Sequence, residues 1–192
     1  MKKVRLTGGI CSGKTIVGKV FGELGIPVFE ADKVSKDILH HDQSIRQAIR
    51  QRYGNGVFDG KTLMNKELAR IVFSDEAELS FINGLLHPKV HEAFDKWTSY
   101  YRDYPYVMEE AAILIESGAW KKMNAIILVK APEELRIQRI INRDHVDRAK
   151  VMTRMSHQLS DEEKEKHSDY AIINDEQFMV VPQVLNIHQQ LI

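Results

Sequence analysis

The sequence predicts an α/β fold with a five-stranded parallel sheet, and two observations support this prediction. Short apolar runs bounded by glycine, proline or charged residues are typical of buried strands, and the segments between them carry apolar residues at helical spacing. Strands that alternate with helices form β-α-β crossovers, which give a parallel sheet. The strand candidates are residues 3–7, 26–29, 106–108, 125–129 and 170–173.

The first strand candidate runs into a glycine-rich loop, and residues 13–24 then follow a helical pattern. The loop satisfies the phosphate-binding pattern G-x-x-x-x-G-K-[ST] in the strand-loop-helix context that this pattern requires. Its backbone N–H groups and the helix N-terminus favour phosphate oxygens. Lys14 is expected to reach the β- and γ-phosphates of ATP, and the Thr15 hydroxyl to ligate Mg²⁺. The predicted ATP-binding residues of the loop are Gly8, Gly9, Ile10, Cys11, Ser12, Gly13, Lys14, Thr15 and Ile16.

Two helical excursions interrupt this P-loop core. Residues 34–103 are charged and mostly helical in pattern, with breaks expected at 53–56, 59–60 and at His87-Pro88. A second helical stretch, within residues 132–166, is rich in arginine, and Ser160 with Glu163 forms a capping box inside it. We therefore predict a single domain with three parts: a core (1–33, 104–134 and 168–192), a helical substrate-binding insertion (34–103) and a helical lid (about 135–167).

Composition narrows the possible partners. The chain has 192 residues, of which 43% are hydrophobic and 28% charged, as in globular proteins. The 27 basic and 27 acidic residues cancel, so no overall field attracts nucleic acid or an anionic membrane. Cys11 is the single cysteine, which excludes an intramolecular disulfide and a cysteine-rich zinc site. We expect a cytoplasmic protein, a monomer or weak homo-oligomer, that binds a small molecule.

The arginines of the second excursion favour a kinase over other P-loop proteins. A guanine-reading Asn/Thr-Lys-x-Asp segment is missing, and motor ATPases need a longer chain. Arg136, Arg139 and Arg143 share one helix face, where they could stabilise charge on a transferring phosphoryl group. The alternative is a solvated basic face, with Arg148, Lys150 and Arg154 included, that pairs with nearby acids such as Glu134, Asp144 and Asp147.

Short motifs of one family are spread along nearly the whole chain. They are Leu6 to Ile10 with Ser12 to Lys14, Ala31-Asp32, Ile82-Asn83, His87-Pro88, Leu114-Ile115-Glu116, Arg139, Arg143-Asp144, Arg154, Gln158, Asp169 and Asn174. In these motifs the chain resembles the dephospho-coenzyme A kinase family, which phosphorylates the ribose 3′-hydroxyl of dephospho-CoA with ATP. The departures from the family pattern are Cys11 for glycine, Ile16 for threonine, Glu30 for the first Asp of its Asp-Ala-Asp segment, and Ala112 for proline.

Asp32 is the predicted base, because a carboxylate near the acceptor hydroxyl can take its proton and a strand end is where α/β sheets bind ligands. The alternative is that Asp32 only N-caps the next helix. Lys14, Arg139 and Arg143 complete the predicted catalytic set. The resemblance implies that Arg139 and Asn174 contact the adenine of ATP. It also implies that the acceptor contacts Thr7, Asp32, His87, Arg154 and Gln158.

Glu109 and Glu110 end the third strand candidate and could act on the metal, and the resemblance favours Glu110 with Thr15. Glu116 is a further candidate, and both adjacent glutamates could instead be solvated. No zinc site is expected. Two rival functions stay open: a nucleoside-monophosphate or shikimate-type kinase, and a regulator that binds ATP without transferring phosphate. Cys11 could be a plain loop residue or a redox-sensitive thiol.

Overall fold

The computed structural model describes residues 1–72, 74–112, 123–156 and 158–192. The chain forms two compact units, one made of Met1–Glu30 with Thr98–Ile192 and the other of Ala31–Trp97. Residues 135–167, the predicted lid, belong to the first unit, so their role as a lid remains a prediction. Within the described residues, no helix is long and apolar enough to cross a membrane.

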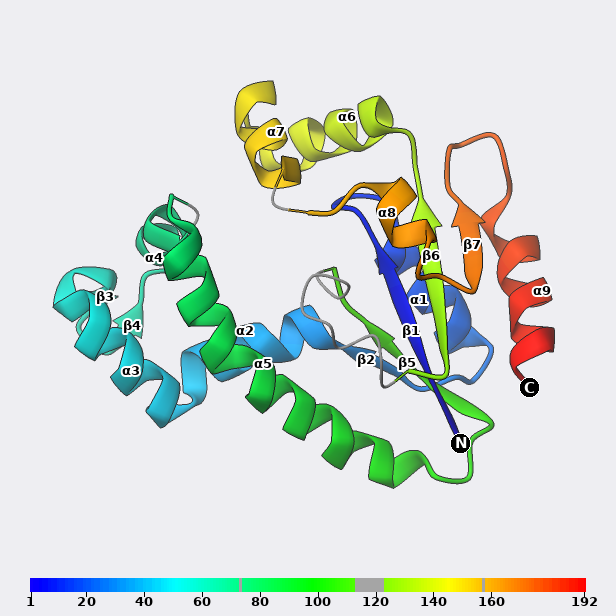
Figure 1. The fold of residues 1–192 in the computed structure, drawn as a ribbon, viewed down its shortest axis with the longest axis horizontal. Coiled ribbons are helices and arrows are strands. Elements are labelled where there is room, and N and C mark those ends of the chain that lie inside the picture. Colours follow the sequence, from blue (N-terminus) through cyan, green and yellow to red (C-terminus); the bar gives the residue numbers. More distant parts are fainter. Residues whose placement is uncertain (73, 113–122, 157) are drawn as a thin grey trace. The chain divides into compact units, whose positions relative to one another are not determined.

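The first unit contains the predicted five-stranded sheet, and all of its strand pairs are parallel (Figure 1). The strand order is β2-β5-β1-β6-β7. The second strand begins later than predicted, because the N–H of Ile26 donates to Phe21 O and so belongs to the turn that ends the first helix. The strands are β1 (Lys2–Gly8), β2 (Val28–Glu30), β5 (Tyr106–Glu110), β6 (Ala125–Lys130) and β7 (Tyr170–Ile173).

Helices α1 (Lys14–Glu23) and α9 (Val180–Leu191) pack on one face of this sheet. Val4 and Leu6 of β1 lie in the same apolar cluster as Phe21 of α1 and Val184 of α9. Side chains alternate along a strand, so Arg5, which lies between Val4 and Leu6, points to the opposite face of the sheet. The arginine-rich segment forms α6 (Glu133–Asp144), α7 (Arg148–Ser156) and α8 (Asp161–Glu165).

The capping box begins α8 as predicted, because the Ser160 side chain accepts a hydrogen bond from the N–H of Glu163.

The second unit is helical, as expected, but it also contains a two-stranded antiparallel hairpin that the sequence interpretation missed. Its core gathers side chains from every helix, for example Ile49 and Leu68. The elements are α2 (Ala31–His41), α3 (Gln43–Tyr53), β3 (Phe58–Asp59), β4 (Thr62–Leu63), α4 (Asn65–Val72) and α5 (Glu76–Thr98), the last of which ends one residue beyond the unit.

The predicted break at His87-Pro88 is wrong, because α5 continues through Pro88. Proline removes one helical hydrogen bond and its ring crowds the carbonyl four residues earlier. Leu86, Val90 and Phe94 are buried at intervals of four residues on both sides of Pro88. Burial of this apolar face outweighs the lost bond, so His87 lies inside a helix and not at its start.

Candidate active site

The loop between β1 and α1 closes on its own backbone. The N–H of Ser12 donates to Gly9 O, and those of Ile16 and Val17 donate to Gly13 O. Gly13 precedes α1 with φ 100°, a left-handed conformation that favours glycine, and a Cβ there would overlap Asn174 Nδ2. Asn174, the residue after β7, therefore packs directly against the loop at Gly13.

Lys14 and Thr15, the first two residues of α1, turn toward different partners. Lys14 is buried, and its Nζ donates to Gly8 O at 2.9 Å and Gly9 O at 3.1 Å. The Thr15 hydroxyl donates to Glu110 Oε1 at 2.7 Å. Gly18 borders this carboxylate, and a Cβ there would lie at an ordinary contact distance of 3.4 Å from Glu110 Oε2. A hydroxyl beside a carboxylate offers the oxygen donors that Mg²⁺ takes from proteins.

Glu109 and Glu110 point to opposite faces of the sheet because they are neighbours on one strand. Glu109 Oε2 forms an ion pair of 3.0 Å with Arg5 Nη1, and both residues are almost fully buried. Burial lowers the pKa of Arg5 to about 10, and the Glu109 charge offsets part of this effect. Since Glu109 is engaged with Arg5, the geometry favours Glu110 at the phosphate loop. Glu116 lies outside the described residues.

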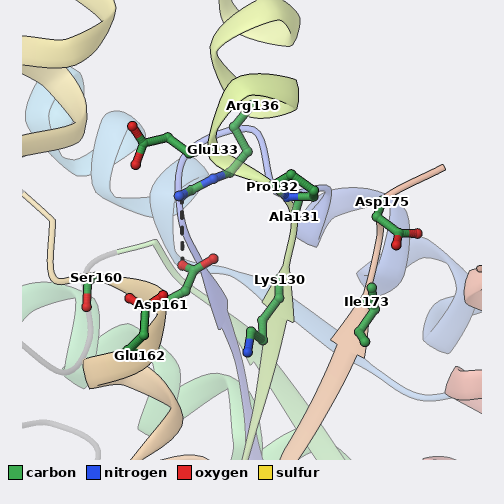
Figure 2. A pocket seen from close by; sticks show the side chains of 10 residues that line it. All are labelled: Lys130, Ala131, Pro132, Glu133, Arg136, Ser160, Asp161, Glu162, Ile173 and Asp175. Carbon is green, nitrogen blue, oxygen red and sulfur yellow. Dashed lines mark ion pairs between the residues drawn. The ribbon is translucent and has the colours of Figure 1, made fainter. Parts of the chain in front are cut away.

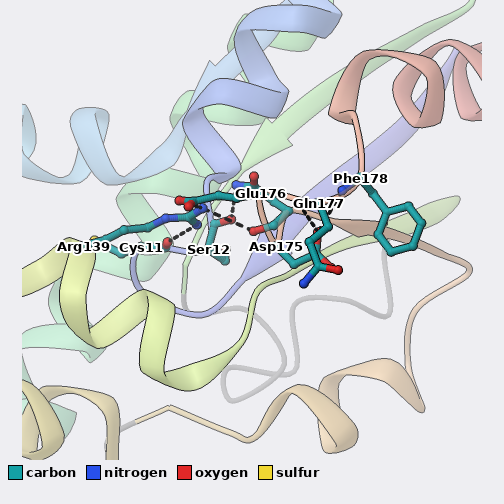
Figure 3. A network of polar contacts seen from close by, with 8 residues as sticks. Cys11, Ser12, Arg139, Asp175, Glu176, Gln177 and Phe178 are labelled. Carbon is teal, nitrogen blue, oxygen red and sulfur yellow. Dashed lines mark hydrogen bonds and ion pairs between the residues drawn. The ribbon is translucent and has the colours of Figure 1, made fainter.

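Arg139 reaches the phosphate loop from α6 (Figure 3). Its guanidinium donates to Cys11 O at 3.3 Å, to Asn174 O at 3.4 Å and to Glu176 Oε1 at 3.0 Å. Asn174 Nδ2 in turn donates to Ser12 O at 2.8 Å. The two residues assigned to the adenine by resemblance therefore meet at the loop, together with Glu176, which sequence reasoning missed.

Arg143 and Arg154 instead share one carboxylate on the surface of the arginine-rich segment. Arg143 Nε and Arg154 Nη1 each lie 2.7 Å from an oxygen of Asp144. The hydrogen bond from Arg143, with a smaller contribution from Arg154, lowers the pKa of Asp144 to about 2. Arg148 pairs with Glu134, also at the surface. Arg143, Arg154 and Arg148 thus pair with acids here, whereas Arg139 lies at the loop, and the predicted roles of Arg143 and Arg154 in the reaction stay predictions.

Other predicted residues of the first unit have structural contacts. Gln158 Oε1 accepts a hydrogen bond of 2.8 Å from the N–H of Ile10. Gln158, which was predicted to bind the substrate dephospho-CoA, therefore contacts the phosphate loop. Asp169 Oδ2 accepts from the N–H of Ile126 in β6. Thr7 is fully buried, and its hydroxyl has no hydrogen-bond partner among the described residues. Cys11 has φ 56° and, with Ile10, packs against the apolar side of α6 and α7.

Asp32 and His87 belong to the second unit. Asp32 is exposed in the first turn of α2, which begins at Ala31. The alternative that Asp32 N-caps this helix is therefore wrong, since it lies inside the first turn. The His87 ring lies 6.5 Å from that of His91, one turn later in α5. Within the described residues, no group of three or more His, Cys, Asp or Glu side chains could hold a metal ion.

A lysine-bearing loop between a strand and a helix, a hydroxyl-carboxylate pair beside it and an arginine that reaches it together define a P-loop kinase. Comparison with known proteins identifies the particular family: the dephospho-CoA kinase family model matches residues 3–179. The chain belongs to the dephospho-CoA kinase family, and its activity is the phosphorylation of dephospho-CoA to coenzyme A. Phosphate donation by ATP follows from the family.

Known relatives agree with this family. A dephospho-CoA kinase of Bacteroides fragilis is 37% identical over 185 residues, which cover 96% of this chain and 90% of that protein. The crystal structure of TT1252 from Thermus thermophilus has a TM-score of 0.86 at 26% identity, with 98% and 96% of the two chains covered. A shikimate kinase from Acinetobacter baumannii in complex with shikimate has a TM-score of 0.56 at 17% identity, with 100% and 93% covered, and shares the fold.

Proposed function

We propose that the chain transfers the γ-phosphoryl group of ATP to the ribose 3′-hydroxyl of dephospho-CoA in a Mg²⁺-dependent reaction. The observation that supports this most directly is the Thr15–Glu110 contact of 2.7 Å beside Lys14. Thr15 and Glu110 would hold Mg²⁺, which supplies charge neutralisation on the phosphates. Lys14, Arg139 and Arg143 would bind the phosphoryl oxygens, and Asp32 would take the proton of the acceptor hydroxyl.

In this proposal the two helical segments have separate roles, one in acceptor binding and one in closing the site. Residues 34–103 bind the acceptor, with His87 on the insertion and Thr7, Arg154 and Gln158 outside it. Residues 135–167 act as a lid that carries Arg139 and Arg143 and excludes water, because an open site would hydrolyse ATP. The cytoplasmic location and the monomeric or weakly oligomeric state stay predictions.

Incubation with ATP and dephospho-CoA is expected to give ADP and a product heavier by one phosphoryl group at the ribose 3′-oxygen. Mass spectrometry with fragmentation reads out both the mass and the position. AMP, CMP and shikimate, offered under the same conditions, are expected to give far less product. A preference for one of these acceptors would support the rival kinase, and ATP binding without any product would support the regulator.

Glu110→Gln is expected to raise the Mg²⁺ concentration for half-maximal activity by about tenfold or more, because an amide oxygen carries no charge for the cation. A Mg²⁺ titration of kcat measures this shift. Glu23→Gln, an exposed glutamate at the end of α1, is the matched control. An unchanged Mg²⁺ requirement in Glu110→Gln would remove this residue from the metal site.

A further inference from the structure

The Arg136 side chain leaves α6 one turn before Arg139 and lies against Gly9 of the phosphate loop. A Cβ on Gly9 would overlap Arg136 Nη1 and lie 2.9 Å from its Cζ. The guanidinium therefore fills the space that a side chain at position 9 would need. Gly9 has no left-handed φ, so the constraint at this position is the room taken by the end of the Arg136 side chain and not the backbone conformation.

Asp161 faces the same guanidinium from the first turn of α8 (Figure 2). Arg136 Nη1 and Asp161 Oδ1 form an ion pair at 3.8 Å, and each side chain is 11% exposed. The pair lies on the wall of a cavity of about 350 Å³. Arg136 Nε and Asp161 Oδ1 are buried and make no hydrogen bond within the part of the chain that the structure describes. Burial of two charges costs desolvation energy, and an ion pair with so few hydrogen bonds repays little of it, so this pair contributes little to stability.

Arg136 and Asp161 lie at the two ends of residues 135–167. The pair thus joins the first helix of this segment to the chain that returns from it, at the point where both adjoin the phosphate loop. Three residues after Arg136, Arg139 contacts Cys11 O. On the returning side, three residues before Asp161, Gln158 accepts from the N–H of Ile10. The contacts of Arg139 and Gln158 with the phosphate loop therefore depend on the positions of α6 and of the chain that leads into α8.

We propose that Arg136 is a positioning residue that holds both ends of the lid against Gly9 and thereby aligns Arg139 with the phosphate loop. The proposal rests on the proposed role of residues 135–167 as a lid. An arginine suits this task because its flat guanidinium can lie against backbone while its charge attracts a carboxylate. The pair thus sets the geometry of the donor site, and its small contribution to stability follows from the missing hydrogen bonds.

A purely structural role and a positioning role predict different results for Arg136→Met. Arg136→Met alone leaves the buried Asp161 charge without its cationic partner, which can destabilise the fold. The double variant Arg136→Met/Asp161→Leu replaces both members of the ion pair by apolar residues, so its stability should change little. Both variants are expected to lower kcat by about tenfold to a hundredfold, because misplaced catalytic groups cost about that much. The KM for dephospho-CoA should stay within about twofold. The double variant should melt within a few degrees of the wild type.

Arg136→Lys keeps the charge and should recover part of kcat. Arg148→Met, which removes an exposed arginine of the same segment, is the matched control and should leave kcat unchanged. If the double variant keeps full kcat, or if kcat falls only as far as the folded fraction falls, Arg136 has no positioning role.

Gly9→Ala tests the contact itself. The added methyl group should displace the guanidinium and lower kcat by about the same factor as Arg136→Met. Gly9→Ala/Arg136→Met should then be no worse than Arg136→Met alone, because the nearest remaining neighbour, Asp161 Oδ1, lies at an ordinary 3.6 Å. If the factors by which the two single variants lower kcat multiply in the double variant, Gly9 and Arg136 act independently and the proposal is overturned.

Amide hydrogen exchange separates this inference from the proposed function. Arg136→Met should speed exchange in residues 9–13 and 158–165 of the full chain, with or without ATP. A wild-type protein that forms no coenzyme A would refute the proposed function alone. Unchanged exchange in both segments would refute the positioning role, even in an active enzyme.

Discussion

Asp32→Asn is expected to lower kcat by about 10²-fold or more, with little change in the KM for ATP. The substitution keeps the size of the side chain and removes the charge that would accept the proton of the 3′-hydroxyl, a contribution of about 10²- to 10⁴-fold in general base catalysis. Asp32 is exposed in the first turn of α2, so its removal leaves no buried group without a partner. Steady-state kinetics with dephospho-CoA and ATP varied in turn measures the effect.

Asp37→Asn is the matched control, because it makes the same chemical change at another exposed position of α2. Its kcat should equal that of the wild type. Thermal melting of Asp32→Asn should show the small loss expected when a negative charge leaves the first turn of a helix, about 0.3–1 kcal/mol. Asp37→Asn, which lies beyond that turn, should show no such loss. Near-normal kcat in Asp32→Asn would show that another group accepts the proton.

Arg5→Met is expected to destabilise the folded protein by about 3–5 kcal/mol, the usual cost of breaking a buried ion pair at one partner. Arg5 is 2% and Glu109 1% exposed, and the two residues form an ion pair of 3.0 Å. Without the Arg5 charge, the buried Glu109 carboxylate loses this cationic partner in a medium of low polarity. Urea denaturation of the variant and the wild type measures the difference.

Arg5→Met/Glu109→Leu should recover most of this loss. Arg5 Nε and Nη2 make no hydrogen bond to any residue that the structure describes, and an apolar pair needs none. Lys150→Met, which breaks an exposed pair with Asp147, should cost no more than about 1 kcal/mol. If Arg5→Met costs no more than Lys150→Met, the buried pair contributes nothing to the fold.

The sequence determined the features that depend on neighbouring residues. The spacing of Gly8, Gly13 and Lys14 predicts the phosphate loop, because the loop and the following helix are formed by one short segment. The apolar runs predict all five strands for the same reason, and the Ser160 capping box predicts the start of α8. The resemblance to the dephospho-CoA kinase family was equally readable, since it rests on short motifs spread along the chain.

Only the tertiary structure decided which side chains meet. Adjacent glutamates look equivalent in sequence, but the pairing of β5 with β1 turns Glu109 to Arg5 and leaves Glu110 beside Thr15. The spacing of the arginines placed Arg136, Arg139 and Arg143 on one helix face, yet Arg136 lies against Gly9 and Arg143 pairs with Asp144. Apart from the pairing of Arg143 with Asp144, these contacts join residues far apart in the chain, and they depend on strand parity and helix placement, which local patterns do not contain.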